Sequence, residues 1–552
     1  MTKKVELMKR LINTYTFLLA ATASLLLGGC SKKIDEAFLN PNASVRVPIE
    51  QILPGVIGNF VGSSSAAGSS YGTAYDGLYV GRYVQFWATN TSGSQYDQMG
   101  GVTGASDLLG SVWAMHYYGM GQNLNKIIEW GTEEEKWDYV GVGLAIRAWS
   151  MLTLTNMYGE APVRDAFNTS KLTFNYDEQP LIYDTVRSIA RQAVTYLERT
   201  DGNVGKGNLA IADAFFNGGD VNKWKKFAYA VIARSFNHLT NKSSYNADSV
   251  VKYCDLAMNT NAENAVAKFA NTGIAGTSNF FGPIRSNVGT LRQTAFAANL
   301  VTGKNSMFTG AYDPRAHYLL REDSTGEITG IVPNKGSSGL PAKNLPFGFW
   351  GSGFAVTAAP SSDASARYLF KNGSPFPIIT ASEIKFIKAE ALLRKGSKTE
   401  ALQAYRQGIE LSIDMLRDNY PQAIPAGKEI TETSKNEFLA NPVVVPAAED
   451  LTLSHIMLQK YIALYGYGFM ETWVDMRRYH YIDNDPVTGT QVYADLTVPS
   501  GIDLFVNNNG KLVYRARPRY NSEYIYNVDE LQRIGALELD YHTKEQWFTI
   551  PQ

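Results

Sequence analysis

The chain has 552 residues, of which 45% are hydrophobic, and its 51 basic residues nearly balance 52 acidic ones. The length exceeds one ordinary domain of ~150 residues, and the apolar content is ample for a large core. A net charge of −1 argues against a nucleic-acid partner and against a polybasic membrane-binding surface.

The chain begins with a pattern typical of a secreted lipoprotein. Four basic residues in the first ten positions precede an apolar run at 17–27, which ends in Leu27-Gly28-Gly29-Cys30. This run is short for a membrane-spanning helix, which needs about 20 apolar residues. Leu-x-Gly-Cys resembles the lipobox of bacterial lipoproteins, which implies that 1–29 is a cleaved signal peptide and that Cys30 is acylated. An ordinary signal peptide followed by a chance cysteine is the alternative.

Helical periodicity begins near Glu129 and predicts three helices in the first half of the chain. The first covers 137–158, is apolar on several sides and ends at Gly159. The second has an amphipathic stripe that follows a candidate N-cap at Asp184 and ends near Asp201. The third covers 221–239. A shorter helix is also possible from Ile49 to Phe60.

A helical hairpin is predicted further on. Thr380 and Glu383 have the spacing of a capping box, and Gly396 provides a turn between two helices. The spacing of Ala389, Leu392, Gly396, Ala401, Tyr405 and Gly408 resembles a tetratricopeptide repeat, a hairpin of ~34 residues. Similar pairs at 137–199 and 221–260 indicate a mostly α-helical frame. Between these blocks lie long Gly-, Ser-, Asn- and Pro-rich loops at 270–290, 322–375 and 481–520.

Catalytic and metal-binding motifs are not convincing. Gly-x-Ser-x-Gly at 68–72 lacks the strand that a nucleophile elbow needs, and helix capping explains Ser382 in Ser382-x-x-Lys385. The six histidines show no metal-ligand spacing, and Val487 stands where a calcium loop beginning at Asp483 needs an oxygen ligand. We therefore expect no catalytic residue, no metal and no cofactor.

Several segments, in order along the chain, resemble the SusD/RagB family of outer-membrane nutrient-binding lipoproteins. They are Asp35-Glu36 with Asn40-Pro41-Asn42 and Leu53-Pro54, Ala145-Ile146-Arg147-Ala148-Trp149 leading to Tyr158-Gly159-Glu160-Ala161-Pro162, Gly219-Asp220-Val221-Asn222-Lys223-Trp224, Ala389-Glu390-Ala391, Gln459-Lys460-Tyr461, Trp473 before Arg477-Arg478, and Pro518-Arg519-Tyr520 with Ser522-Glu523-Tyr524 and Asn527. Asn521 replaces a proline of the family's terminal motif.

The resemblance implies one SusD-like domain at 30–552, in which tetratricopeptide-like hairpins pack beside irregular loops. It also implies a protein of the cell surface, attached to the outer membrane only through its lipid anchor. Such a protein would bind a nutrient, expected to be an oligosaccharide or in some members a peptide. It would deliver that nutrient to a SusC-like TonB-dependent transporter, which docks on the hairpin side, and it would not be an enzyme.

A sugar-binding site needs aromatic planes with polar groups beside them, and a preformed platform limits the ordering cost of binding. Two aromatic-rich regions meet this description, although core packing is the alternative for every ring. The first region contains Tyr83, Gln85, Trp87, Asn90, Tyr96, Asp97 and Trp113, and the second contains Phe280, Phe281, Arg285, Phe347, Phe349 and Trp350.

Two other functions remain open from the sequence. A surface glycoside hydrolase would cleave oligosaccharides and lose activity when one carboxylate is removed. A tetratricopeptide assembly lipoprotein facing the periplasm would bind protein rather than glycan. The long aromatic loops argue against the second alternative, and the missing catalytic signature argues against the first.

Overall fold

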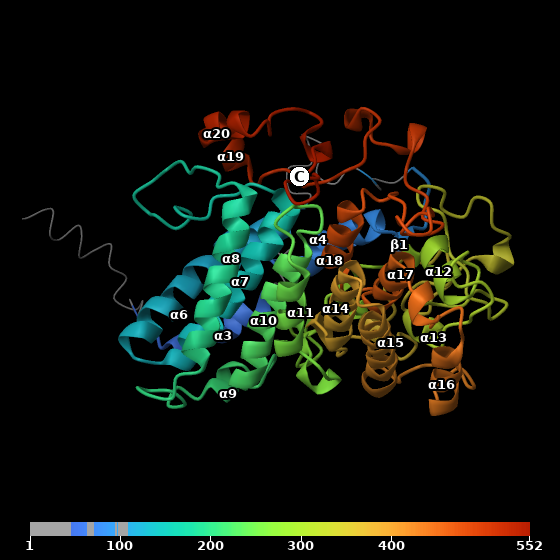
Figure 1. The fold of residues 1–552 in the computed structure, drawn as a ribbon, viewed down its shortest axis with the longest axis horizontal. Coiled ribbons are helices and arrows are strands. Elements are labelled where there is room, and N and C mark those ends of the chain that lie inside the picture. Colours follow the sequence, from blue (N-terminus) through green and yellow to red (C-terminus); the bar gives the residue numbers. More distant parts are fainter. Residues whose placement is uncertain (1–45, 63–70, 94–96, 98–108) are drawn as a thin grey trace, which may run out of the picture. The chain divides into compact units, whose positions relative to one another are not determined.

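Paired helices build most of this computed structural model, which describes residues 46–62, 71–93, 97 and 109–552 (Figure 1). A π-helical segment, Met115–Gly121, joins α5 to α6. The α-helices of the described part are α3 (Ile49–Gly58), α4 (Thr73–Tyr83), α5 (Ser111–Ala114), α6 (Gln122–Glu133), α7 (Trp137–Tyr158), α8 (Gln179–Leu197), α9 (Leu209–Ala212), α10 (Val221–Asn237), α11 (Ala247–Leu256), α12 (Ala295–Val301), α13 (Ala316–Leu319), α14 (Ala381–Lys395), α15 (Lys398–Asn419), α16 (Glu432–Ala440), α17 (Leu453–Ala463), α18 (Phe469–Arg478), α19 (Asn521–Tyr526) and α20 (Val528–Arg533).

The strands of the described part are few and short. β1 (Trp87–Thr89) pairs antiparallel with β3 (Leu291–Gln293), and β2 (Ala265–Ala267) pairs antiparallel with β4 (Phe376–Ile379). An isolated two-stranded ribbon is marginally stable at best, so packing against the helices must hold these ribbons in place. The predicted mostly helical fold with long irregular loops is confirmed.

Helices that follow one another in the chain pack as neighbouring pairs. α7 packs along α8, α8 contacts α10, and α10 packs along α11. α11 in turn contacts α14, which packs along α15. Figure 1 shows α8, α10, α11, α14 and α15 in that order across the molecule. The hairpins predicted at 137–199, 221–260 and after Thr380 are therefore present as α7–α8, α10–α11 and α14–α15.

The α14–α15 hairpin forms as the sequence predicts, with one exception. Gly396 ends α14 in the left-handed region at φ +87°, which glycine adopts without steric cost. A Cβ atom at Gly408 would lie 3.0 Å from the ring of Phe386, so a small residue is needed where the two helices cross. Thr380 accepts a hydrogen bond from the backbone N–H of Glu383 at 3.3 Å. The expected reciprocal bond is absent, because the Glu383 carboxylate pairs with Arg234 instead.

Two helix starts differ from the predictions. α8 begins at Gln179, five residues before the expected N-cap Asp184, because Pro180 occupies the first turn, where its missing N–H has no cost. Helices also begin well before Glu129, since α4 occupies Thr73–Tyr83 and α6 starts at Gln122. Part of the first aromatic region is therefore helix rather than loop. The helix predicted from Val221 is confirmed, with Asp220 as its N-cap.

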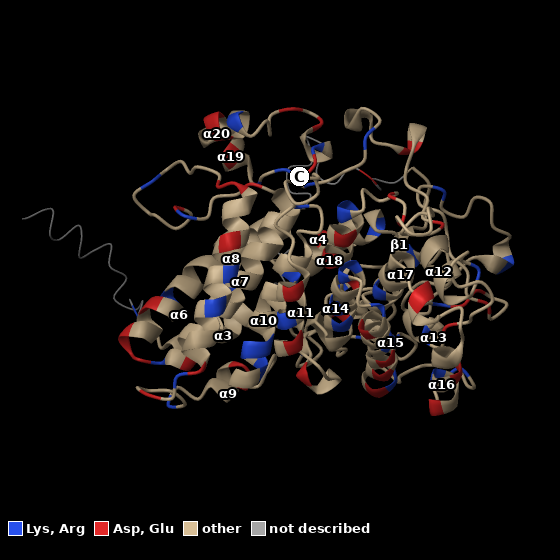
Figure 2. Ribbon diagram, viewed as in Figure 1, with Lys and Arg blue, Asp and Glu red and all other residues tan. Residues whose placement is uncertain are grey.

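Buried ion pairs connect the helices at the centre of the fold. On α10, Arg234 pairs with Glu383 at 2.6 Å, and on α18, Arg478 pairs with Glu390 at 2.7 Å. Breaking a buried pair leaves an uncompensated charge, so each pair ties its two helices strongly. Elsewhere basic and acidic residues are mixed along the ribbon (Figure 2).

The predicted leader at 1–29 and the acylated Cys30 lie outside the described residues, so they stay predictions. Residues 49–552 form one compact unit, and the boundary predicted at residue 30 is not tested. Within the part of the chain that the structure describes, no helix has the length and apolarity needed to cross a membrane.

Candidate ligand-binding groove

The two predicted aromatic regions come together in the structure, but as core. Trp87 is fully buried, and its ring lies 5.7 Å from that of Phe281 and 6.3 Å from that of Phe349. The indole Nε1 donates to the carbonyl of Leu78 at 3.0 Å. Neither ring face of Trp87 is open, so its expected exposure is corrected. The residues that bury this ring lie about 200 to 380 positions later in the sequence.

Most of the other aromatic candidates that the structure describes are also covered by protein, and Phe347 is half-buried. Trp350 donates its Nε1 hydrogen to the carbonyl of Phe281 at 2.8 Å, and Phe280 packs edge-on against Phe281. Trp113 packs against Tyr158, and the hydroxyl of Tyr83 accepts a hydrogen bond from the N–H of Val513. The expected exposure of these rings is corrected in the same way. The fully or nearly buried candidates are Tyr83, Trp87, Trp113, Phe280, Phe281, Phe349 and Trp350.

Two polar candidates, Arg285 and Asp97, bond to the protein backbone instead of lying in the aromatic core. Arg285 is half-buried and donates from Nη1 to the carbonyl of Ala275 at 3.0 Å. Asp97 is buried and accepts hydrogen bonds from Phe505 N and Asn508 Nδ2, so it fixes the loop after residue 504. Burial raises the pKa of Asp97 to about 6. Tyr96 lies outside the described residues. Whether any of these side chains contacts a ligand stays a prediction.

A hollow of about 730 Å³ opens beside the end of β1, and Asn90 is the one predicted candidate that lines it. Its walls come from three loops that are far apart in the sequence. They are Asn90, Thr91, Ser92 and Gly93 after β1, Asn334, Lys335, Ser337 and Ser338, and Ile502 with Asp503. The lining is therefore rich in amide and hydroxyl groups.

Asn90 is held in place at the edge of this hollow. Its backbone N–H donates to the carbonyl of Thr290 at 2.8 Å, which continues the β1–β3 pairing. Its side-chain Nδ2 donates to the carbonyl of Phe354 at 3.2 Å. Its Oδ1 accepts no hydrogen bond from the residues that the structure describes. The Oδ1 atom is itself buried, so Asn90 forms a rigid part of the wall at the strand end.

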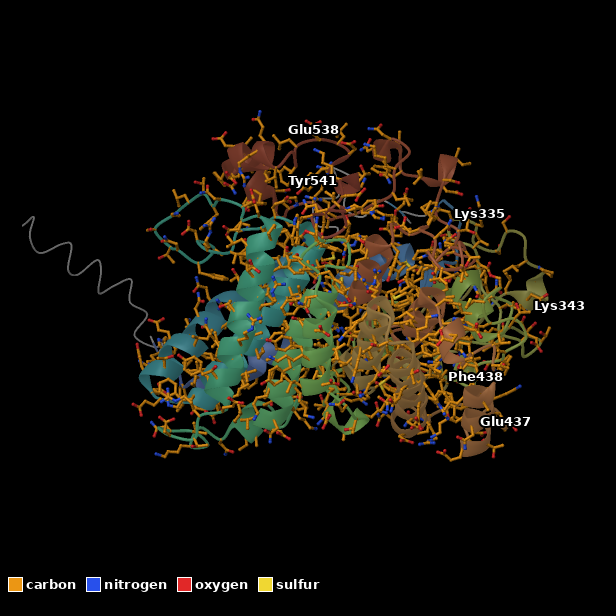
Figure 3. The ribbon with its side chains drawn as sticks, in the orientation of Figure 1. Lys335, Lys343, Glu437, Phe438, Glu538 and Tyr541 are labelled. Atoms are coloured by element: carbon orange, nitrogen blue, oxygen red, sulfur yellow. The ribbon has the colours of Figure 1, made fainter. Side chains whose placement is uncertain are left out.

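Two of the residues that line the hollow, Lys335 and Asp503, form an ion pair. Lys335 Nζ lies 3.1 and 3.0 Å from the two carboxylate oxygens of Asp503, and the lysine side chain is 45% exposed. Figure 3 labels Lys335 in the upper right of the molecule. An exposed pair of this kind contributes little stability, so its groups can exchange partners with a ligand at low cost. The side chain of Ile502 is 98% exposed at the rim and offers an apolar contact.

A second hollow of about 230 Å³ continues from the first and shares Asp503 with it. Gln85 and Phe296 line its inner wall, and Asp495 lies at its outer side. The Asp495 carboxylate accepts hydrogen bonds from the N–H and the hydroxyl of Ser306, at 2.6 and 2.8 Å. We call the two hollows together the groove. Its donors and acceptors suit noncovalent recognition of hydroxyl-rich or amide-rich ligands.

Sequence reasoning found Asn90 but missed Asn334, Lys335 and Asp503. They fall within the long loops predicted at 322–375 and 481–520, and loop length was the only signal for them. The sequence could not pair Lys335 with Asp503 across 168 residues. Among the described residues, no group of three or more His, Cys, Asp or Glu side chains could hold a metal ion.

Comparisons with known proteins agree on one family. A SusD-like family model, described as "Starch-binding associating with outer membrane", matches residues 67–499. A search of curated proteins found no match.

Solved structures share the fold of this chain. A SusD homolog from Bacteroides fragilis has 19% identity and a TM-score of 0.65, with 91% of this chain and 100% of that chain covered. A SusD/RagB family protein from Bacteroides thetaiotaomicron has 19% identity and a TM-score of 0.63, with 92% and 100% covered. A structure described as a chitin-binding protein has 19% identity and a TM-score of 0.65, with 91% and 100% covered.

Proposed function

This chain belongs to the SusD-like family, and from that premise we propose that it is a cell-surface lipoprotein that binds an oligosaccharide in the groove. The proposed action is noncovalent. The bound sugar passes to a SusC-like TonB-dependent transporter in the outer membrane. Acylated Cys30 is the proposed anchor and the only proposed contact with the membrane.

The hollow beside Asn90 carries this proposal. Sugar hydroxyls both donate and accept hydrogen bonds, so they need an amide acceptor, a carboxylate and an ammonium group within one small space. Asp503 and Lys335 supply the charged groups around about 730 Å³, and Asn90, Asn334, Ser337 and Ser338 line it with amide and hydroxyl side chains. The family description and the chitin-binding relative support a glycan over a peptide.

Binding to defined sugars tests the proposal. The soluble chain from Ser31 onward is applied to an array of starch-derived and chitin-derived oligosaccharides, and calorimetry then measures the affinity for the strongest binder. Asn90→Ala and Lys335→Ala each remove one polar contact, which we expect to weaken binding about tenfold. Lys343→Ala, at an exposed lysine that does not line the groove, is the matched control.

Three outcomes would contradict the proposal. Unchanged affinity in both groove variants would move the binding site elsewhere. Absence of glycan binding together with binding to a peptide array would replace the ligand class. Release of shorter sugars over time would make the protein an enzyme.

A further inference from the structure

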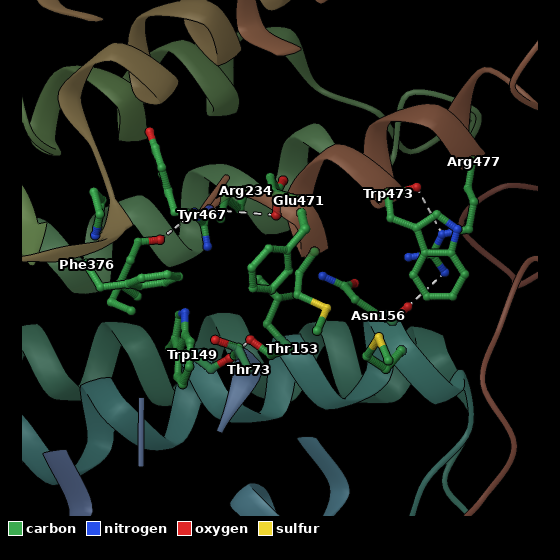
Figure 4. Close-up of a pocket in the computed structure, with 17 residues that line it drawn as sticks. Thr73, Trp149, Thr153, Asn156, Arg234, Phe376, Tyr467, Glu471, Trp473 and Arg477 are labelled. Carbon is green, nitrogen blue, oxygen red and sulfur yellow. Dashed lines mark hydrogen bonds and ion pairs between the residues drawn. The ribbon is translucent and has the colours of Figure 1, made fainter. Parts of the chain in front are cut away.

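A cavity lined almost entirely by buried residues lies between α7, α18 and β4, and it shares no lining residue with the groove (Figure 4). Its volume is about 50 Å³. A single buried water needs roughly 10–15 Å³ of such space, so about three to five waters fit. Thr153 and Asn156 of α7 face Glu471 and Arg477 of α18 across it.

Arg477 brings a buried positive charge to one end of the cavity. Its Nε donates to the carbonyl of Trp473 at 3.1 Å, and its Nη1 donates to the carbonyls of Asn156 and Tyr514, both at 2.8 Å. Its Nη2 has no hydrogen-bond partner among the described residues. The side chain is fully buried, and an unpaired buried donor of this kind is costly.

The side chains that face Arg477 keep hydrogen-bonding groups that no described protein atom uses. Glu471 Oε1 bonds to His238 at 2.6 Å, whereas its Oε2 lies 3.7 Å from Arg234, which is too long for a hydrogen bond. Asn156 Oδ1 accepts from the hydroxyl of Tyr183 at 2.8 Å, which leaves its amide hydrogens for the cavity. Thr153 Oγ1 donates to the carbonyl of Trp149 and keeps its lone pairs.

We propose that this cavity holds a cluster of ordered waters that bridges the Arg477 guanidinium to the Glu471 carboxylate. The space is large enough, and it contains both donors and acceptors, which is the condition for a stable buried water. A bound anion would satisfy Arg477 but would face the carboxylate of Glu471 in the same small volume. A water molecule can accept a hydrogen bond from Arg477 and donate one to Glu471.

The cluster adds to the direct hydrogen bond between Arg477 of α18 and Asn156 of α7. Asn156 is near the end of α7, Glu471 and Arg477 belong to α18, and Arg477 also holds the carbonyl of Tyr514. The waters therefore position Arg477 as the support for the segment after residue 513. This role is independent of any ligand in the groove.

A crystal structure of the purified protein at better than ~1.8 Å tests the proposal directly. We expect at least two water peaks within hydrogen-bond distance of Arg477 Nη2, Asn156 Nδ2 and Glu471 Oε2. A second crystal soaked in bromide shows no anomalous peak in the cavity. An empty cavity would overturn the proposal, and so would an anomalous bromide peak beside Arg477.

A cavity-filling variant gives a second test in solution. Thr153→Ile replaces the hydroxyl with an ethyl group that enters the cavity, displaces water and leaves Arg477 Nη2 unpaired. The control is Thr195→Ile on α8, because the Thr195 hydroxyl makes the same bond to the carbonyl four residues earlier but is exposed. We expect Thr153→Ile to raise the unfolding equilibrium constant about tenfold relative to the control. A dry cavity would instead be filled favourably, so a variant as stable as the control or more stable would refute hydration.

Discussion

Replacing Trp87 tests whether this residue belongs to the core or stacks on a ligand. Trp87→Phe removes the hydrogen bond from Nε1 to Leu78 O, at ~1 kcal/mol. It also leaves about 40 Å³ of space beside Phe281 and Phe349, which at ~24 cal/mol per Å³ adds ~1 kcal/mol. The total expected loss of unfolding free energy is therefore about 2–3 kcal/mol. Because no ring face of Trp87 is open, the affinity for the array-selected sugar should stay within about twofold.

Urea unfolding and calorimetric titration of the same preparations measure the two quantities. Trp130→Phe on α6 is the control, since this half-buried tryptophan does not belong to the cluster around β1. An unfolding midpoint equal to that of the wild type, combined with a large loss of sugar affinity, would refute the assignment of Trp87 to the core.

Three further predictions follow from buried groups and from one turn. Burial raises the pKa of Asp76 from its usual 3.8 to about 7, so between pH 5 and 7 the folded protein holds a proton that the unfolded chain releases. The unfolding free energy should therefore rise as the pH falls from 8 to 5. Urea titrations at each pH measure this slope, and Asp76→Asn should flatten it. Arg478→Met leaves Glu390 buried without its main partner and should lower the unfolding free energy by ~3–5 kcal/mol in chemical unfolding. The double variant Arg478→Met/Glu390→Gln should recover part of this loss, and a double variant no more stable than the single one would contradict the pairing. Gly396→Ala places a Cβ at φ +87° and should lower the unfolding free energy by ~1 kcal/mol, whereas an unchanged midpoint would show that the turn tolerates side chains.

Local signals in the sequence were enough for the helical frame. The helix at 137–158 is apolar around its circumference and ends at Gly159, and both features depend only on neighbouring residues. The prediction of Asp184 as an N-cap was wrong because it also used only a local signal. A good N-cap residue can lie inside a helix whose first turn contains an earlier proline.

The groove could be predicted only in part, because its walls meet through long-range packing. Asn90 follows a strand and lies in the hollow, whereas Trp87, three residues earlier, points into the core. Sequence cannot distinguish these two outcomes until the positions of Phe281 and Phe349 are known. The same holds for Lys335 and Asp503, which approach each other only in the folded chain.

The three-loop wall of the hollow has an evolutionary consequence. The segments at 90–93, 334–338 and 502–503 lie outside every α-helix, so a substitution in one of them leaves the helical packing intact. Under the proposed function, the ligand preference can therefore change by substitution in one loop at a time, without any change in the helical frame.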